Sequence, residues 1–278
     1  MPTPPRLSIF LTSFATALLA LSACASTPPA VKGPDPQLLA AIANPARAVT
    51  AVARDASRHP AAELAFFGIK PSMTVVEIWP GGGYWTEILG HYLAAQGQYW
   101  MALPVMANAE ESPGRKRLRA LIAGHNGNLG TIREGQLGAN AFNIASPGSA
   151  DLVLTFRNLH NWMEDGFAEQ AIAECFRALK PGGILGVEEH RGRNDQPQDP
   201  KGKSGYVRQD YAIASIEKAG FEFAGASEIN ANPKDTKDWP DGVWTLPPTL
   251  TLGDKDREKY LAIGEADNFV LKFRKPKR

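Results

Sequence analysis

Short apolar runs recur along the chain from residue 73 onward, and each is followed by a segment whose apolar residues have helical spacing. The runs predict strands at 73–79, 98–103, 151–156, 184–188, 221–227 and 269–273, with a short third strand at 130–133. The intervening patterns predict helices at 84–95, 115–123, 167–179 and 211–219. Strands that alternate with helices are typical of a parallel sheet with right-handed crossovers.

Other segments flank or interrupt this alternation. Residues 38–58 are rich in alanine and predict a helix broken at Pro45, and residues 61–67 predict a second, short helix. Residues 230–248 form a long polar stretch with two tryptophans between the last two predicted strands. Long ordered loops at that end of a sheet often form lids or binding walls, and a structural cap over the sheet is the alternative.

The N-terminus has the pattern of an export signal. Arg6 precedes a mostly apolar stretch at 7–21, which is too short to span a bilayer comfortably and is typical of a secretory signal. The stretch ends in Leu-Ser-Ala-Cys at 21–24, which resembles a lipobox cleaved before Cys24. We therefore expect a lipoprotein signal peptide at 1–23, a Pro/Ala-rich tether at 24–37 and a folded domain at 38–278; ordinary secretion, with cleavage at an Ala-x-Ala site, is the alternative.

This interpretation predicts where the protein resides. Lipidation of Cys24 would anchor it to a membrane on the periplasmic side, and Ala25 fits the outer-membrane sorting rule of some bacteria. The only other cysteine is Cys175, so an acylated Cys24 leaves no intramolecular disulfide. Cys175 lies in the helical pattern at 167–179 and is predicted to be a small buried core residue.

The composition favours a single globular α/β domain. The chain has 278 residues, of which 44% are hydrophobic and 21% charged, an ordinary globular balance. Thirty basic and twenty-nine acidic side chains give a formal net charge of +1. Because binding to phosphate backbones needs a concentrated basic surface, we expect no nucleic-acid partner.

The strongest local signal for a binding site is a glycine-rich turn. Glu77 ends the first predicted strand, and Trp79, Pro80 and three glycines at 81–83 lead into the next predicted helix. In an open α/β sheet the ligand binds at the carboxyl ends of the strands, and glycines there let the backbone approach it closely. The context of strand, turn and helix therefore indicates a ligand site.

Three further motifs follow in order: SADLVLTFRN at 149–158, ALKPGGIL at 178–185 and KAGF at 218–221. With the glycine turn, they resemble the motifs of the class I S-adenosylmethionine-dependent methyltransferases, over about residues 73–221. The resemblance implies a Rossmann-like α/β fold with a seven-stranded, mostly parallel sheet, helices on both faces and a C-terminal antiparallel hairpin. It also implies methyl transfer to a small-molecule acceptor, with S-adenosylmethionine as the cofactor.

The chain is also similar to a narrower group of predicted methyltransferases whose acceptor is not established. The shared motifs are EIWPGGGY at 77–84, FRNLHNW at 156–162 and NPKDTKD at 232–238. This similarity implies a class of protein without specifying a reaction.

The resemblance implies cofactor-binding roles for a set of residues at the ends of the strands: Glu77, Trp79, Gly81, Gly82, Gly83, Gln136, Arg157 and Asn158. The chain departs from the family pattern at three positions. Trp79 stands in place of the first glycine, Leu103 stands where an acid usually accepts the ribose hydroxyls, and Gln136 stands where an acid usually binds the adenine amine. Glu110, Glu111 or Glu134 are candidates to replace the ribose acid.

Candidate catalytic residues lie at the ends of the fourth and fifth predicted strands, at 151–156 and 184–188. His160 is a candidate general base or metal ligand, and Glu189 and His190 end the neighbouring strand at the same edge of the sheet. Two imidazoles and a carboxylate also suit several divalent metals. The alternatives are a structural histidine and a charge cluster that only satisfies a strand end. Candidate substrate-side residues are Trp162, Arg191, Tyr206 and Arg208.

Three functions follow from these features. The first is methyl transfer by a membrane-anchored exported enzyme. The second is a methyltransferase-fold binding protein without transfer activity, which the departures at Trp79, Leu103 and Gln136 favour. The third is a metal-dependent enzyme that uses His160, Glu189 and His190.

Overall fold

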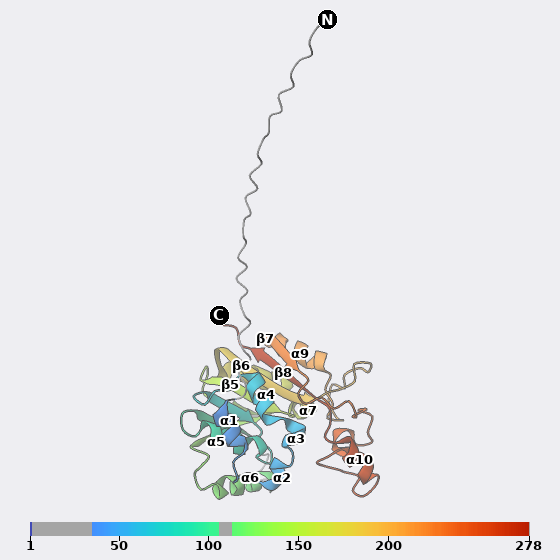
Figure 1. Ribbon diagram of the computed structural model, residues 1–278, viewed down its shortest axis with the longest axis horizontal. Helices are drawn as coiled ribbons and strands as arrows, with labels where there is room; N and C mark the ends of the chain where they lie inside the picture. The colour runs from blue at the N-terminus through green and yellow to red at the C-terminus, as the bar shows by residue number, and fades with distance from the viewer. Residues whose placement is uncertain (2–34, 106–112, 278) are drawn as a thin grey trace. The chain divides into compact units, whose positions relative to one another are not determined.

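The computed structural model describes Met1 and residues 35–105 and 113–277 (Figure 1). Cys24 and nearly all of the predicted signal peptide and tether lie outside the described residues, as do Glu110 and Glu111. The first helix begins at Pro36, two residues before the predicted start of the folded domain. Among the described helices, none is long and apolar enough to cross a membrane.

An eight-stranded sheet forms the centre of the domain, in the order β4-β3-β2-β1-β5-β6-β8-β7. Its strands are β1 (Thr74–Ile78), β2 (Gln98–Pro104), β3 (Ile132–Gly138), β4 (Ala141–Asn143), β5 (Ala150–Phe156), β6 (Leu179–His190), β7 (Glu222–Ser227) and β8 (Asn268–Arg274). Strands β3, β2, β1, β5 and β6 pair in parallel, and β8 is antiparallel to both β6 and β7. The predicted Rossmann-like fold with its C-terminal antiparallel hairpin is confirmed.

The structure extends the predicted sheet at the β3 edge. β3 continues to Gly138, well beyond the predicted short strand, and β4 pairs with it in antiparallel fashion as an eighth strand. β4 has only three residues, Ala141 to Asn143, and so it is too short to give an alternating pattern in the sequence.

Ten α-helices and one 3-10 helix are found in the described residues. They are α1 (Pro36–Ile42), α2 (Val49–Val52), α3 (Asp55–Arg58), α4 (Pro60–Phe67), α5 (Tyr84–Leu93), α6 (Pro113–Gly124), α7 (Leu159–Glu164), α8 (Ala168–Ala178), α9 (Gln209–Lys218), η1 (Gly242–Thr245) and α10 (Arg257–Ile263). The helical pattern at 38–58 is divided into three short helices, and the sequence did not predict α7 or α10. Both unpredicted helices have only two turns or fewer, which gives little periodicity to detect.

Alternating strand residues contribute to two separate hydrophobic cores. Val75, Leu152 and Leu154 pack with residues of α1, α4 and α5 on one face of the sheet. Val76 and Val153 pack with residues of α7, α8 and α9 on the other face. Successive strand side chains point to opposite faces, so these buried strands need apolar residues at almost every position.

Cys175 belongs to the second core, as its sequence context predicts. Its side chain is buried on α8, and burial raises the pKa of the thiol above its usual value. A buried thiol that keeps its proton is unreactive.

The segment between β7 and β8 has a small core of its own. Val243, Leu246 and Tyr260 are buried there together with Tyr206, which precedes α9, and the two tryptophans of the polar stretch, Trp239 and Trp244, pack against them. The predicted loop at 230–248 contains η1 and is part of an ordered extension that continues to α10, seen in orange to red beside the sheet in Figure 1.

Gly186 on β6 lets a buried aromatic ring lie directly on the sheet. A Cβ at this position would come within 2.8 Å of Phe67 Cδ1 and 2.8 Å of Leu154 Cδ2. We predict that Gly186→Ala lowers the free energy of unfolding by about 1–3 kcal/mol, because the packed core must shift to admit a methyl group. Urea unfolding measures this, with Gly124→Ala as the control because a Cβ there meets nothing within 4 Å. Equal stability of the two variants would contradict the prediction.

Candidate functional site

The glycine turn after β1 is held in an unusual backbone conformation. Trp79, Gly81 and Gly83 have φ angles of 49°, 57° and 87°, all in the left-handed region. Glycine adopts this region without strain, but a tryptophan rarely does. The two glycines at 81 and 83 are therefore explained by the turn itself, and Trp79 needs a compensating interaction.

Trp79 is fixed to the neighbouring strands by two hydrogen bonds. Its backbone N–H donates to Ala102 O at 2.8 Å, and its indole Nε1 donates to Leu137 O at 3.1 Å. Its ring also packs edge-on against Trp162, with 6.3 Å between the centroids. These contacts hold the left-handed turn and direct the indole toward β3.

A cavity of about 380 Å³ lies beside this turn, at the carboxyl ends of β1 and β2. Its lining comes from the turn, the end of β2, the start of α6 and the residue before α7: Trp79, Pro80, Gly81, Gly82, Leu103, Pro104, Gly114, Arg115, Arg117, Leu118 and Asn158. A Cβ built at Gly81 or Gly82 would meet nothing within 4 Å. The space that a side chain would fill at these two positions is therefore open to a ligand, which is where this class of sheet places one.

Four of the predicted cofactor residues line the cavity, namely Trp79, Gly81, Gly82 and Asn158. Leu103 stands where the family pattern has an acid, and together with Pro104 it forms an apolar wall of the cavity. Arg115 and Arg117 were not predicted from the sequence, because a helix that follows the second strand gives no local sign of which residues face a cavity.

Glu77 lies beneath the turn and is not among the residues that line the cavity. Its side chain is 1% exposed and accepts hydrogen bonds from the hydroxyls of Thr86, at 3.0 Å, and Tyr99. Burial raises the pKa of Glu77 to about 7, although the two hydrogen bonds oppose this shift. Glu77 thus ties β1 to β2 and to the first turn of α5.

Three other predicted cofactor residues lie outside the cavity lining. Gln136 is exposed on β3, next to Leu103 in the pairing register. Gly83 caps α5, where a Cβ would approach the side chains of α6. Arg157 faces a cluster of charged residues described below, and Glu134 pairs with Arg115 at 3.5 Å.

The structure brings His160, Glu189 and His190 together at the ends of β5 and β6. Glu189 Oε1 lies 2.9 Å from His160 Nδ1, and the Glu189 carboxylate also accepts the backbone N–H groups of His160 and His190. Burial disfavours the charged form of Glu189, but the two imidazoles and these hydrogen bonds outweigh it and lower its pKa. An ionised carboxylate only accepts, so His160 Nδ1 carries the proton and Nε2 can accept one.

His190 is held as a neutral imidazole. Burial lowers its pKa to about 3, and its Nδ1 lies 2.7 Å from Asn268 Oδ1. The two histidine rings are 5.6 Å apart, and the possible ligand atoms of His160, Glu189 and His190 lie within 4.8 Å of one another. Glu189 already accepts three hydrogen bonds, two of them from His160, so its carboxylate holds the His160 ring in one orientation. This arrangement suits His160 as a proton acceptor.

The predicted substrate-side residues have different surroundings. Trp162 is buried in the core against Trp79, and Arg208 pairs with Asp210 on the surface. Arg191 pairs with Glu228 and Asp267. Tyr206 donates its hydroxyl to Asp235, and its ring packs against His190 with 6.5 Å between the centroids.

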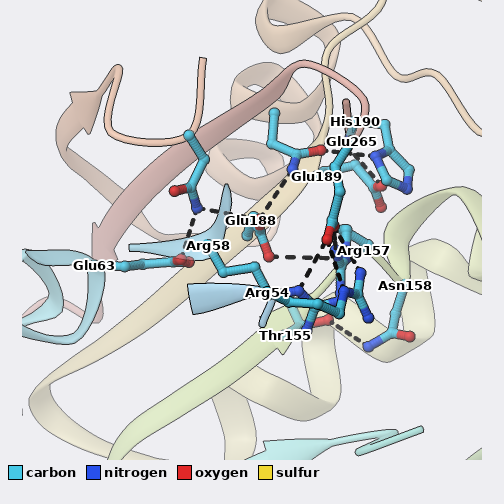
Figure 2. Close-up of polar contacts among 12 residues, drawn as sticks. Arg54, Arg58, Glu63, Thr155, Arg157, Asn158, Glu188, Glu189, His190 and Glu265 are labelled. Carbon is cyan, nitrogen blue, oxygen red and sulfur yellow. Dashed lines mark hydrogen bonds and ion pairs between the residues drawn. The ribbon is translucent and has the colours of Figure 1, made fainter. Parts of the chain in front are cut away.

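A charged cluster that was not predicted from the sequence lies on the other face of the sheet (Figure 2). Arg54 and Arg58, at the two ends of α3, join Arg157, which follows β5, around Glu265. Glu63 and Glu188 are buried beside them and share a hydrogen-bond donor, Nδ2 of Asn230. No local motif signals this cluster, because Arg54 and Glu265 are 211 positions apart in the sequence.

Comparisons with known proteins agree with this fold. Residues 123–187 match the family model described as methyltransferase domain, and a search of curated proteins found no match to the chain. A solved S-adenosylmethionine-dependent methyltransferase from Aquifex aeolicus is 14% identical with a TM-score of 0.54, and the alignment covers 80% of this chain and 93% of that one.

Two other solved structures resemble the chain. The 4+2 cyclase SpnF is 18% identical with a TM-score of 0.56, covering 86% of this chain and 91% of that one. A phosphoethanolamine N-methyltransferase 2 from Haemonchus contortus, solved with S-adenosylmethionine, is 16% identical with a TM-score of 0.50, covering 77% and 51% of the two chains. The family match at residues 123–187 and the fold together support a methyltransferase enzyme.

The raised pKa of Glu77 predicts a pH dependence of stability. An acid whose pKa rises from 4.5 to about 7 on folding stabilises the protein fully below pH 4.5, and this contribution is lost as the pH rises through 7. We predict that the stability of the wild type relative to Glu77→Gln falls by about 3 kcal/mol between these pH values. Chemical unfolding at several pH values measures it, with the exposed carboxyl of Glu222, changed in Glu222→Gln, as the control. Parallel pH profiles for wild type and Glu77→Gln would contradict the prediction.

Proposed function

We propose that this protein transfers the methyl group of S-adenosylmethionine to a small-molecule acceptor, as an exported enzyme anchored to a membrane through Cys24. The observation that carries the cofactor assignment is the open space beside Gly81 and Gly82 at the carboxyl ends of β1 and β2. The donors and surfaces around that space fit such a cofactor: a glycine backbone, an apolar wall from Leu103 and Pro104, and the amide of Asn158.

S-Adenosylmethionine, when bound, supplies an activated methyl group on a positively charged sulfur. The residues of this chain have to hold cofactor and acceptor in line, because alignment accounts for much of the rate in such a transfer. The glycine turn and Trp79 form one wall of the cofactor site, and Asn158 marks the end that faces β5. Asn158 is itself fixed, since its Nδ2 donates to Ile78 O at 3.0 Å.

His160 is the residue we assign to proton removal from the acceptor. It follows Asn158 by two positions, at the start of α7, and Glu189 holds its ring so that Nε2 is the basic atom. A buried carboxylate that accepts from one ring nitrogen fixes the tautomer and leaves the other nitrogen free to accept a proton. The acceptor is accordingly expected to carry an ionisable N–H, O–H or S–H group.

A binding protein without transfer activity is the second candidate. Leu103 lines the cavity at the place where the family pattern has an acid for the ribose hydroxyls. The same fold is also present in the cyclase SpnF. A ligand with fewer hydroxyl groups would suit the apolar wall better than a ribose does.

Binding of S-adenosylmethionine to Gly82→Val tests the proposed cofactor site. Gly82 has no left-handed φ and free space at its Cβ, so valine adds bulk to the cavity without straining the backbone. We predict that titration calorimetry gives binding by the wild type and an affinity lower by about tenfold or more in Gly82→Val, because the side chain occupies ligand space.

Two controls accompany this measurement. Gly124→Val adds the same bulk where a Cβ meets nothing within 4 Å and lies outside the cavity lining, so it should bind as the wild type does. His160→Gln should also keep cofactor affinity, because His160 is assigned to the acceptor. Absence of binding by the wild type at millimolar cofactor would overturn the proposed function and leave the second candidate.

The membrane anchor has its own test. The chain has two cysteines, so Cys175→Ala is a matched control for Cys24→Ala. We predict that the wild type and Cys175→Ala incorporate labelled palmitate in a bacterial host and sediment with membranes, whereas Cys24→Ala does neither, because the acyl chains need the Cys24 thiol and the new N-terminus. A wild-type protein without label would contradict lipidation.

A further inference from the structure

Three arginine side chains converge on a single carboxylate at the carboxyl end of β5. Arg54 donates to both oxygens of Glu265 at 2.6 Å, and Arg157 Nη1 lies 3.3 Å from Glu265 Oε2 (Figure 2). Arg58 Nε lies 3.7 Å from the same oxygen, Oε2. The single Glu265 carboxylate is therefore in contact with three guanidinium groups.

Arg58 is incompletely satisfied in this arrangement. It is 4% exposed, and its Nε has no hydrogen-bond partner. Burial and the nearby charges of Arg157 and Arg54 lower the pKa of Arg58 to about 9. A buried guanidinium that carries an unused donor is costly, and an additional acceptor at this position would relieve the cost.

The neighbouring acids do not balance the three arginines. Burial and the nearby Glu188 charge raise the pKa of Glu63 well above its usual value, which favours its neutral form. Even with Glu188 and Glu265 both ionised, the three guanidinium groups leave one positive charge without a matching carboxylate. The next acid, Asp55, already forms a bidentate pair with Arg47.

The cluster adjoins the proposed site of methyl transfer. Arg157 directly precedes Asn158, which lines the cavity, and the backbone N–H of Arg157 donates to Glu188 O at 2.7 Å. Glu188 in turn precedes Glu189, which orients His160. An anion held by the arginines would therefore lie close to the cavity, on the opposite face of the sheet from the proposed base.

We propose that Arg54, Arg58 and Arg157 bind an acidic group of the methyl acceptor, a carboxylate or a phosphate, and that the Glu265 carboxylate occupies this anion position in the free protein. Guanidinium groups match the oxygens of either anion with pairs of hydrogen bonds. This inference rests on the proposed function for the identity of the ligand as acceptor. The anion site itself is testable without the cofactor.

Removal of the competing carboxylate is the sharpest test. In Glu265→Gln the three arginines lose their anionic partner, so we expect lower thermal stability in chloride buffer than for the wild type. We expect inorganic phosphate or succinate, titrated at constant ionic strength, to restore that stability and to bind about tenfold or more tightly than to the wild type. Glu169→Gln is the matched control, because Glu169 forms an exposed ion pair with Lys218.

Removal of an arginine should have the opposite effect. Arg54→Gln or Arg157→Gln, each combined with Glu265→Gln, is expected to lower the affinity for phosphate or succinate by about 30-fold or more relative to Glu265→Gln alone. Lys218→Gln removes one exposed positive charge and should change nothing. The single variant Arg54→Gln provides the test if Glu265→Gln fails to fold. The Arg54 side chain is 25% exposed, so its replacement should leave the fold intact. We expect this variant to lose the weak anion response of the wild type.

The outcomes separate the possible sources of the anion. A response to phosphate alone supports a phosphorylated acceptor, and a response to succinate alone supports a carboxylic acid.

Equal anion effects in Glu265→Gln and Glu169→Gln would overturn the anion site. Loss of S-adenosylmethionine binding in Arg157→Gln would assign the arginines to the cofactor's own carboxylate and overturn the acceptor assignment. An anion response in a protein that binds no cofactor would refute the proposed function and leave the anion site standing.

Discussion

Parallel pairing of β2, β1, β5 and β6 is the constraint on which the candidate site depends. Ile78 at the end of β1 pairs with Ala102 on one side and Thr155 on the other, and Phe156 pairs with Glu188. Strands in this register end at nearly the same level, so the turns that follow them start from one edge. The glycine turn, Asn158, His160 and the end of β6 are neighbours for this reason, although they are far apart in the sequence.

Alternation along β6 then divides the polar groups of that edge between two faces. Glu188 points to the face of Gly186, which carries the N-terminal helices, and it lies beside Arg157 and Glu63. Glu189 points to the opposite face, where α7 supplies His160. Two consecutive glutamates thus belong to two different environments, an arginine-rich one and a histidine-rich one, because successive strand residues face opposite sides.

Burial determines the charge state of the groups at this edge. Glu63 and Glu77 are buried with neutral hydrogen-bonding partners, and their pKa values are raised. Glu189 and Glu265 are also shielded from water, yet nearby imidazoles or guanidinium groups lower their pKa values. The same fold therefore raises the pKa of some buried carboxyl groups and lowers the pKa of others, according to whether burial or the neighbouring cationic and hydrogen-bonding groups have the larger effect.

The sequence determined the order of strands and helices, the Rossmann-like class of the fold, the glycine turn and the burial of Cys175. These features depend on local apolar periodicity and on glycine conformation, which are properties of neighbouring residues. It also identified His160, Glu189 and His190, because polar residues follow buried strands at one edge. Only the tertiary structure decided that Glu77 lies beneath the turn, that Leu103 and Pro104 wall the cavity, and that Arg54 and Arg58 meet Glu265. The reason is physical: contacts between distant segments depend on how helices pack over each face of the sheet, and no spacing within the sequence records them.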